Sequence, residues 1–215
     1  MVDDFVSWCD KSFLKINVLK TKDMVVDFRK SPPSPKLTDI KGEKLELVDS
    51  YKYLGVIVDN KLCFEPQADA ISKKVQQRLF FLRKMNSFNV CTKMMTIFYR
   101  SFIESILTFC IIAWYGNLTV TTKNRLVSLV RVASKISGAS QTQLKDLYDK
   151  LVLRRADSIL GALGSDHPLR SQFELLPLGR RFRAADLETK RFKVSFVPSA
   201  ISSLNSRKPK KKQRS

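Results

Sequence analysis

Two adjacent aspartates, Asp3 and Asp4, are the first candidates for chemistry in this sequence. Paired carboxylates hold the metal ions of nucleic-acid polymerases, and two-metal phosphoryl transfer needs several carboxylates that converge on one point. No strand-like run precedes Asp3, the pattern after Asp4 is helical, and the acids beyond residue 60 are scattered. We therefore predict that the pair caps a helix and suits its dipole. We expect the chain to contain no catalytic and no metal-binding residues.

Other residue types that support catalysis are sparse. His167 is the only histidine, which excludes His-based zinc sites, the two-His facial triad of iron oxygenases and most His-dependent hydrolases. The four cysteines, Cys9, Cys63, Cys91 and Cys110, form no C-x-x-C pair. We expect reduced cysteines that act as small apolar residues in an intracellular protein, and no cofactor.

Positive charge is unevenly distributed along the chain. The net charge is +19; residues 1–60 carry ten basic and ten acidic side chains, so 29 basic and 10 acidic side chains follow them. This surplus indicates a polyanionic partner, with nucleic acid as the first choice and an anionic membrane surface as the second. The most apolar stretch, residues 105–116, is shorter than the ~20 apolar residues of a spanning helix. We predict a buried core helix there and no membrane partner.

The first 62 residues predict a small α/β unit. Apolar residues at helical spacing follow Asp4 as far as Ile16. A short strand is expected at 24–28 and a loop at 31–35, and two strands are expected around Lys41-Gly42, followed by a third at Tyr51–Val58.

From Glu65 the apolar period becomes helical. One stripe contains Ile71, Val75, Leu79, Leu82 and Met85, and further helices are expected at about 91–115, 120–137 and 142–160, the last two ending near glycines. Residues 63–163 thus predict an all-α bundle with a basic exterior. Residues 164–215 predict an irregular basic segment with a disordered tail. The expected fold class is α+β.

Several motifs in order resemble the reverse transcriptases of non-LTR retrotransposons, downstream of their catalytic F-x-D-D turn. They are Trp8-Cys9, the N-x-x-K-T-K run Asn17–Lys22 and the Y-K-Y-L-G run Tyr51–Gly55. The segments 76–85, 98–117 and 167–183 continue the resemblance over nearly the whole chain. The resemblance implies the end of a polymerase palm at 1–62 and a thumb at 63–163.

The resemblance also implies roles for single residues. Lys20 matches a lysine placed near the incoming triphosphate, where it acts as a point charge or proton donor; a plain surface lysine is the alternative. Tyr53, Leu54 and Gly55 match the primer grip, which steadies the growing 3′ end; an ordinary strand with a glycine kink is the alternative.

Basic residues of the thumb-like region would contact the phosphates of a template–primer duplex, or simply face solvent. They are Lys73, Lys74, Arg78, Lys123, Arg131 and Lys135. Arg180, Arg181 and Arg183 alternate with phenylalanine, which suits stacking on exposed bases as well as a core role. The expected partners are RNA, DNA or an RNA–DNA hybrid. The basic run 207–214 is a candidate nuclear-import signal, or a segment that merely raises non-specific affinity.

The family's F-x-D-D turn and everything before it are absent, and Asp3-Asp4 follows the point where that turn should stand. The expected function is therefore nucleic-acid binding without catalysis. The sequence also resembles a module named for the N-terminus of an AlkB-type dioxygenase and tRNA methyltransferase homologue. With one histidine and no G-x-G-x-x-G, the chain supports neither chemistry. This alternative implies an RNA-binding or interaction module without catalysis of its own.

We predict that the purified chain does not extend a primer, because it lacks the convergent carboxylates that two-metal catalysis needs. The measurement is incorporation of labelled nucleotides on a primed template with Mg²⁺ or Mn²⁺. Template-directed incorporation would contradict the prediction.

Overall fold

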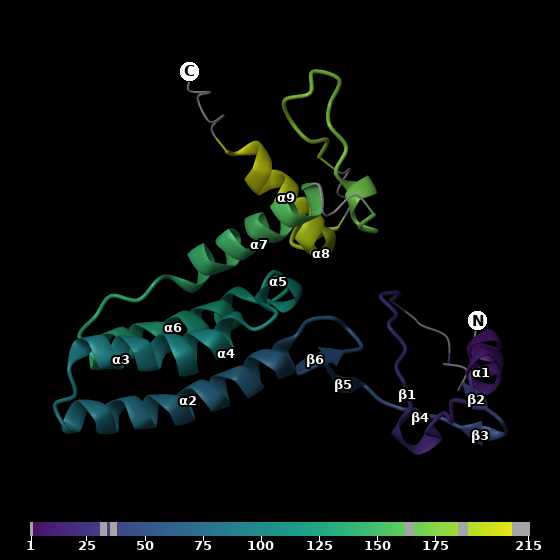
Figure 1. Ribbon diagram of the computed structural model, residues 1–215, viewed down its shortest axis with the longest axis horizontal. Coiled ribbons are helices and arrows are strands. Elements are labelled where there is room, and N and C mark those ends of the chain that lie inside the picture. Colours follow the sequence, from purple (N-terminus) through teal and green to yellow (C-terminus); the bar gives the residue numbers. More distant parts are fainter. Residues whose placement is uncertain (1, 31–33, 35–37, 162–165, 185–188, 208–215) are drawn as a thin grey trace. The chain divides into compact units, whose positions relative to one another are not determined.

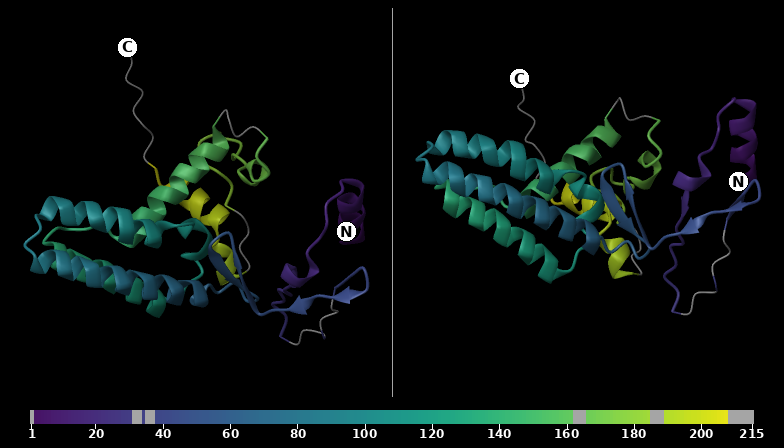
Figure 2. Two further views of the ribbon diagram at one scale, coloured as in Figure 1. Left: turned by 60° about the horizontal axis from the view of Figure 1, so that its bottom comes forward. Right: turned by 90° about the horizontal axis from the view of Figure 1, so that it is seen from below.

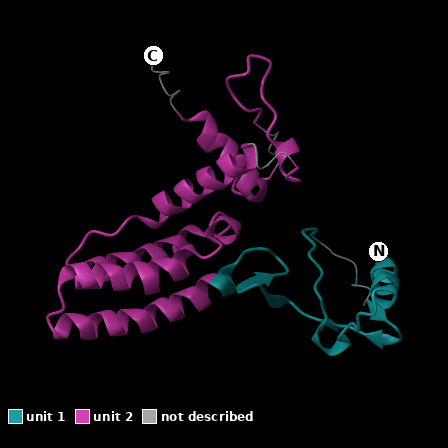
Figure 3. Ribbon diagram, viewed as in Figure 1, with its two compact units in different colours: residues 1–67 teal, residues 68–215 magenta. Residues whose placement is uncertain are grey.

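This computed structural model describes residues 2–30, 34, 38–161, 166–184 and 189–207. The chain divides into two compact units, residues 1–67 and residues 68–215, which are coloured separately in Figure 3. The described residues contain helices and short paired strands, which confirms the α+β class (Figure 1). The division between the units falls within the first long helix, a few residues after the boundary predicted from the sequence.

Helix α1 (Val2–Lys11) begins the first unit. Asp3 and Asp4 both lie inside its first turn, where the positive end of the helix dipole favours carboxylates, instead of preceding the helix as a cap. The predicted continuation to Ile16 is wrong, because the helix ends at Lys11 and Phe13 has a φ of 56°. The rings of Phe5 and Trp8 are exposed and stack on each other, and of the helix residues Cys9 is the buried one.

The strands of the described residues form three two-stranded sheets. β1 (Lys22–Asp23) pairs with β4 (Glu46–Leu47) in parallel, whereas β2 (Asp39–Ile40) with β3 (Glu43–Lys44) and β5 (Ser50–Tyr53) with β6 (Val56–Asp59) are antiparallel. The two strands predicted around Lys41-Gly42 are confirmed, and both turn residues have positive φ. The predicted strand at 24–28 is wrong, because this segment is extended without a partner strand. The single strand predicted at Tyr51–Val58 is instead the β5–β6 hairpin.

A buried carboxylate joins this hairpin to the next helix. Asp59 is 6% exposed and accepts backbone N–H groups from Lys61, Cys63 and Phe64 at 3.1, 3.1 and 2.7 Å. Leu62 and Phe64 in this loop have φ of 48° and 58°, a left-handed conformation that costs free energy for residues with a side chain. Asp59 therefore holds a loop whose backbone is intrinsically unfavourable.

A second contact anchors β6, the strand that also carries Asp59. The side-chain oxygen of Gln67, itself buried in helix α2 (Glu65–Ser87), accepts the backbone N–H of Ile57 at 2.9 Å. The hairpin is thus attached to the start of α2 by a carboxylate and an amide, both withdrawn from water.

The second unit is a helical bundle. α2, α3 (Thr92–Phe98) and α6 (Val120–Ser137) run side by side in the views of Figures 1 and 2, and the loop 138–143 joins α6 to α7 (Leu144–Leu160). The predicted apolar stripe of α2 is confirmed from Ile71 to Leu82. The fully buried side chains include Leu82, Met95, Tyr99, Ile103, Leu107, Trp114, Leu126, Leu144 and Ile159. Gly138 ends α6 at a φ of 66°, as predicted.

The helix predicted at 91–115 is not continuous. α3 passes through a π-helical turn, η2 (Tyr99–Glu104), into α4 (Ser105–Thr108), and α5 (Ile111–Trp114) follows a corner at Cys110, where φ is 49°. The Trp114 indole N–H donates to the Phe109 carbonyl across this corner at 2.9 Å. Composition alone cannot reveal the corner, because cysteine seldom adopts positive φ.

This segment is also less buried than a core helix. Thr92–Trp114 is long and apolar enough to cross a membrane by length and composition, and 28% of its most apolar window is buried. Four of its large side chains, Met94, Ile97, Phe102 and Phe109, are exposed. The corner at Cys110 limits the uninterrupted helix to Thr92–Thr108, about 25 Å of rise against about 30 Å of bilayer hydrocarbon.

The C-terminal region is more ordered than the irregular segment that the sequence predicts. After a 3₁₀ turn, η4 (Arg170–Gln172), and a long loop come α8 (Lys190–Lys193) and α9 (Phe196–Asn205), and α9 packs on α7. Pro198 lies in the first turn of α9, a position that tolerates a missing N–H, and Ala200 and Ile201 are buried. The basic tail 208–215 lies outside the described residues.

Replacing Asp59 is expected to destabilise the first unit. Burial by itself raises the pKa of Asp59, but hydrogen bonds from the Cys63 and Phe64 N–H groups, the Cys63 thiol and the Lys61 N–H outweigh it, so the folded pKa lies below 3.8. We expect Asp59→Ala to lower the free energy of unfolding by about 2–3 kcal/mol, measured by urea denaturation.

The pH dependence has a defined sign. Because the folded pKa is the lower one, this stabilisation is complete above the ordinary value of 3.8 and is lost as pH falls through the folded pKa. Asp59→Asn should therefore lose less stability than the natural protein between pH 5 and pH 2, values that bracket the ordinary carboxyl pKa of about 4. Parallel acid profiles for the two proteins would contradict this role.

Candidate nucleic-acid interface

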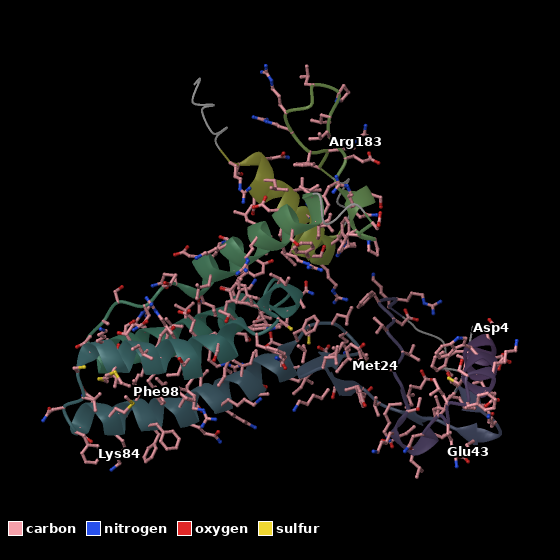
Figure 4. All side chains as sticks on the ribbon, in the orientation of Figure 1. Asp4, Met24, Glu43, Lys84, Phe98 and Arg183 are labelled. Carbon is pink, nitrogen blue, oxygen red and sulfur yellow. The ribbon has the colours of Figure 1, made fainter. Side chains whose placement is uncertain are left out.

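A hollow of about 600 Å³ in the first unit brings two of the predicted site residues together. Lys20 and Tyr53 both line it, although they belong to separate sequence motifs. The remaining lining residues, which with these two define the first-unit hollow, are Thr21, Lys22, Asp23, Met24, Val48, Tyr51 and Val58. Figure 4 labels Met24, in the extended segment that follows β1.

The N-x-x-K-T motif builds the turn that carries Lys20. Asn17 precedes the 3₁₀ turn η1 (Val18–Lys20), and its side-chain oxygen accepts the Lys20 backbone N–H at 3.1 Å. The Thr21 hydroxyl donates to the Asn17 carbonyl at 2.9 Å. Asparagine and threonine satisfy the backbone here, which leaves the Lys20 ammonium exposed for another partner.

The other charges of the first-unit hollow are already paired. Lys22 forms an ion pair with Glu46 across the β1–β4 strands, and Asp23 accepts both the N–H and the hydroxyl of Thr38, at 3.2 and 2.7 Å. Lys20, by contrast, forms no side-chain hydrogen bond or ion pair with any residue in the described ranges. It is therefore the ammonium of the hollow that is available to an anion.

The hairpin tip is a two-residue turn and not the ordinary strand with a glycine kink that is the alternative to a primer grip. Tyr53 pairs with Val56, and between them Leu54 and Gly55 have φ of 46° and 89°. Positive φ at both turn residues is the type I′ pattern that matches strand twist. Leu54 is 78% exposed, so no packing compensates for its unfavourable backbone.

Two exposed tyrosine rings lie on one face of β5. Tyr51 and Tyr53 are two residues apart and so share a face, with 42% and 63% of each residue exposed. Such rings can stack on bases or pack on sugars, and each hydroxyl can donate or accept a hydrogen bond. Sequence reasoning missed Tyr51 and Lys22 as site residues, although the period of two in Y-K-Y could have shown that Tyr51 shares the face of Tyr53.

Within the second unit, the predicted phosphate contacts lie on the outer faces of two helices. Lys73 and Lys74 on α2 and Arg131 and Lys135 on α6 are exposed, and Arg78 is half-buried. None of these residues lines the first-unit hollow.

Lys123 lies in a different environment from the other helix lysines. It is half-buried, and its ammonium donates to the Gly116 carbonyl at 2.9 Å and lies 5.3 Å from the centre of the Tyr115 ring. Burial, and then the nearby charge of Lys145, lowers the pKa of Lys123. It therefore faces the bundle and not an open helix surface.

The arginines of the G-R-R-F-R run lie on the loop between η4 and α8. Arg180 and Arg181 are exposed, and Arg183, labelled in Figure 4, lies 3.8 Å from Glu174. The Phe182 ring packs edge-on against Phe173, and the backbone of Phe182 is held on both sides by the Asn205 amide. Of the two interpretations of this phenylalanine, the geometry matches the packing role.

Metal chemistry has no support in the described part of the chain. No group of three or more His, Cys, Asp or Glu residues there could hold a metal ion. Asp3 and Asp4 stand on α1 without further carboxylates converging on them.

Known proteins match parts of the chain. A family model described as "Alkylated DNA repair protein alkB homolog 8, N-terminal" matches residues 67–105. A Drosophila melanogaster protein described as "Probable RNA-directed DNA polymerase from transposon BS" is 30% identical over 77 residues, which cover 36% of this chain and 8% of that protein. Both resemblances are confirmed. No solved structure matches the chain.

The two matches cover only parts of this chain. The matched stretch covers 8% of the transposon relative's length, so the match supports a resemblance to that protein and does not carry its activity to this chain. The alkB-homologue match falls on α2, α3 and the π-helical turn, which belong to the helical bundle.

Because both turn residues have positive φ, we predict that substitutions at Leu54 and Gly55 change the free energy of unfolding in opposite directions. Leu54→Gly should raise the free energy of unfolding by about 0.5–1 kcal/mol, because glycine adopts positive φ without a Cβ clash. Gly55→Ala should lower it by about 1 kcal/mol for the converse reason. Urea denaturation of both variants measures the difference; a shift of the same sign in both would mean that the turn is not left-handed.

Proposed function

We propose that this chain binds a template–primer nucleic acid and that it derives from a transposon reverse transcriptase. The observation that carries the proposal is the first-unit hollow, where two exposed tyrosines meet a lysine that has no partner among the described residues. The ammonium of Lys20 would contact a phosphate, and the rings of Tyr51 and Tyr53 would contact the adjoining sugar or base. The two motifs that supply them are those that the resemblance assigns to triphosphate and primer contacts.

Phosphate contacts from the bundle would add affinity without sequence preference. Lys73, Lys74, Arg131 and Lys135 are exposed on α2 and α6, and residues 61–215 carry nearly three basic side chains for each acidic one. Such contacts release counterions, so binding should weaken steeply as salt is raised. The proposal assigns binding, and no catalysis, to this chain. It also assigns nuclear import to the basic run 207–214.

A second candidate function is protein interaction through the bundle. The region that matches the alkB-homologue module carries exposed rings and apolar side chains: Phe80, Phe81, Phe88, Met94, Ile97 and Phe102. Exposed apolar groups of this kind mark interaction surfaces. An interaction module of this charge would still bind nucleic acid non-specifically, and it would show no preference for a duplex.

The test is the affinity of the full chain for an RNA–DNA hybrid, single-stranded RNA and single-stranded DNA of one sequence, measured by fluorescence anisotropy at several salt concentrations. We expect the hybrid to bind most tightly. Tyr53→Ala should weaken hybrid binding about tenfold, and Lys20→Gln should weaken it severalfold and reduce the salt slope by about one.

Matched controls come from the same unit. Lys52→Gln removes a lysine from the opposite face of β5, and Phe13→Ala removes a ring that is 98% exposed elsewhere. Both controls should bind like the natural protein. Equal affinity for hybrid and single strands, with no effect of the Lys20 and Tyr53 substitutions, would reject template–primer binding and favour the interaction module.

A further inference from the structure

A separate pocket of about 330 Å³ lies wholly within the second unit. Three lysines from three helices line it: Lys123 of α6, Lys145 of α7 and Lys193 of α8. Among the described residues that line it, Asp149 is the one acidic residue, so these residues carry a surplus of two positive charges. We call this cavity the lysine pocket.

Close backbone contact builds one wall of the lysine pocket. A Cβ added to Gly116 would lie 2.2 Å from the Val194 carbonyl oxygen, so the α8–α9 connection lies directly against this glycine. Tyr148 of α7 and Ser199 of α9 both line the pocket, and α9 packs on α7, so α7 contacts the same segment. Lys193, next to Val194, is thereby held beside the lysines of α6 and α7.

The three ammonium groups differ in what they already contact. Lys145 is paired with both carboxylate oxygens of Asp149, at 3.0 and 2.7 Å. Lys123 donates to the Gly116 carbonyl and faces the Tyr115 ring, which leaves it further N–H capacity. Lys193, Ser202 and Ser203 have no side-chain hydrogen bond or ion pair with any residue that the structure describes.

We propose that the lysine pocket binds one phosphate group through Lys123, Lys193 and the hydroxyls of Ser202 and Ser203. A phosphate dianion matches the surplus of two positive charges and offers several acceptor oxygens to ammonium and hydroxyl donors. The volume lies at the lower end of small-ligand sites and leaves room for a sugar beside the phosphate. Tyr115 and Tyr148 are buried, so the pocket offers no free ring for a base.

This inference goes beyond template–primer binding, because free phosphate alone should occupy the pocket. It uses none of the residues of the first-unit hollow, and it assigns Lys123 to the wall of a pocket instead of the outer face of the bundle. The phosphate can come from a free nucleotide or from a nucleic-acid strand, and the two sources are separable by competition.

The first experiment is ³¹P NMR line broadening of inorganic phosphate by the full chain, with circular dichroism to verify that each variant is folded. Lys193→Gln should weaken phosphate binding about tenfold, the loss of one charge-assisted contact. Lys150→Gln is the matched control, since Lys150 lies exposed on α7 outside the pocket, and it should change binding little. Absence of broadening, or equal weakening by both variants, would overturn the proposal.

A second pair of variants tests the proposal in the opposite direction. Asp149→Asn removes the carboxylate that competes for Lys145 and should tighten phosphate binding at least about threefold. Asp146→Asn, on the same helix but not in the pocket, removes the same charge and should have a smaller effect. Weaker binding by Asp149→Asn than by Asp146→Asn would overturn the assignment.

Competition then identifies the source of the phosphate. Displacement of inorganic phosphate by adenosine monophosphate supports a free nucleotide, and displacement by a single-stranded oligonucleotide at lower concentration supports a strand. If the Lys20 and Tyr53 substitutions leave hybrid binding unchanged while phosphate binding holds, template–primer binding is rejected and the lysine pocket is retained. The reverse result removes only the lysine pocket.

Discussion

The carboxylate of Asp59 is the interaction on which the arrangement of the first unit depends. Among the buried residues that the structure describes, it is the one that carries a charge. Burying a charge is costly unless hydrogen bonds replace the lost water, and three backbone N–H groups do so here. Those N–H groups belong to a loop with two left-handed residues, so the loop and the carboxylate are stable only together. The position of β6, and through it the outward face of β5 with Tyr51 and Tyr53, follows from this contact.

The two cavities offer different chemistry to a ligand. The first-unit hollow has one unpaired ammonium and two exposed rings, which suit a phosphate together with its sugar or base. The lysine pocket offers ammonium groups and hydroxyls, and its tyrosines are buried. A basic chain can therefore contain one surface that suits a phosphate together with its base and one pocket that suits a phosphate without contacts to a base. Net charge does not distinguish the two, because the difference lies in which rings are exposed.

Periodicity predicted the elements whose burial is one-sided. The stripe of α2, the extent of α6 and α7 and the stop at Gly138 follow from apolar spacing and a glycine with positive φ. The two strands around Lys41-Gly42 follow from a turn sequence of the usual kind. These features are local, so a single sequence is enough to recognise them.

The features that sequence reasoning missed depend on unusual backbone or on distant neighbours. Leu54 and Cys110 adopt positive φ without the residue type that signals it, so the hairpin turn and the helix corner were not predicted. Lys123 has the spacing of an exposed lysine, and only the fold shows that its ammonium reaches the Gly116 carbonyl. The first-unit hollow combines Lys20 and Tyr53 through the β1–β4 and β5–β6 pairings, which no local pattern specifies.

The exposed apolar side chains of α2 and α3 have a consequence for how molecules of this protein meet. Phe80, Phe81, Met94 and Ile97 face outward on helices of a chain with a net charge of +19. Like charge keeps such molecules apart, and it does so over the Debye length, about 10 Å at 0.1 M salt. Raising the ionic strength shortens that range while leaving the apolar attraction in place. Colloidal stability of this protein is therefore an electrostatic property, and a nucleic acid that neutralises the basic surface would bring the exposed rings of neighbouring molecules together.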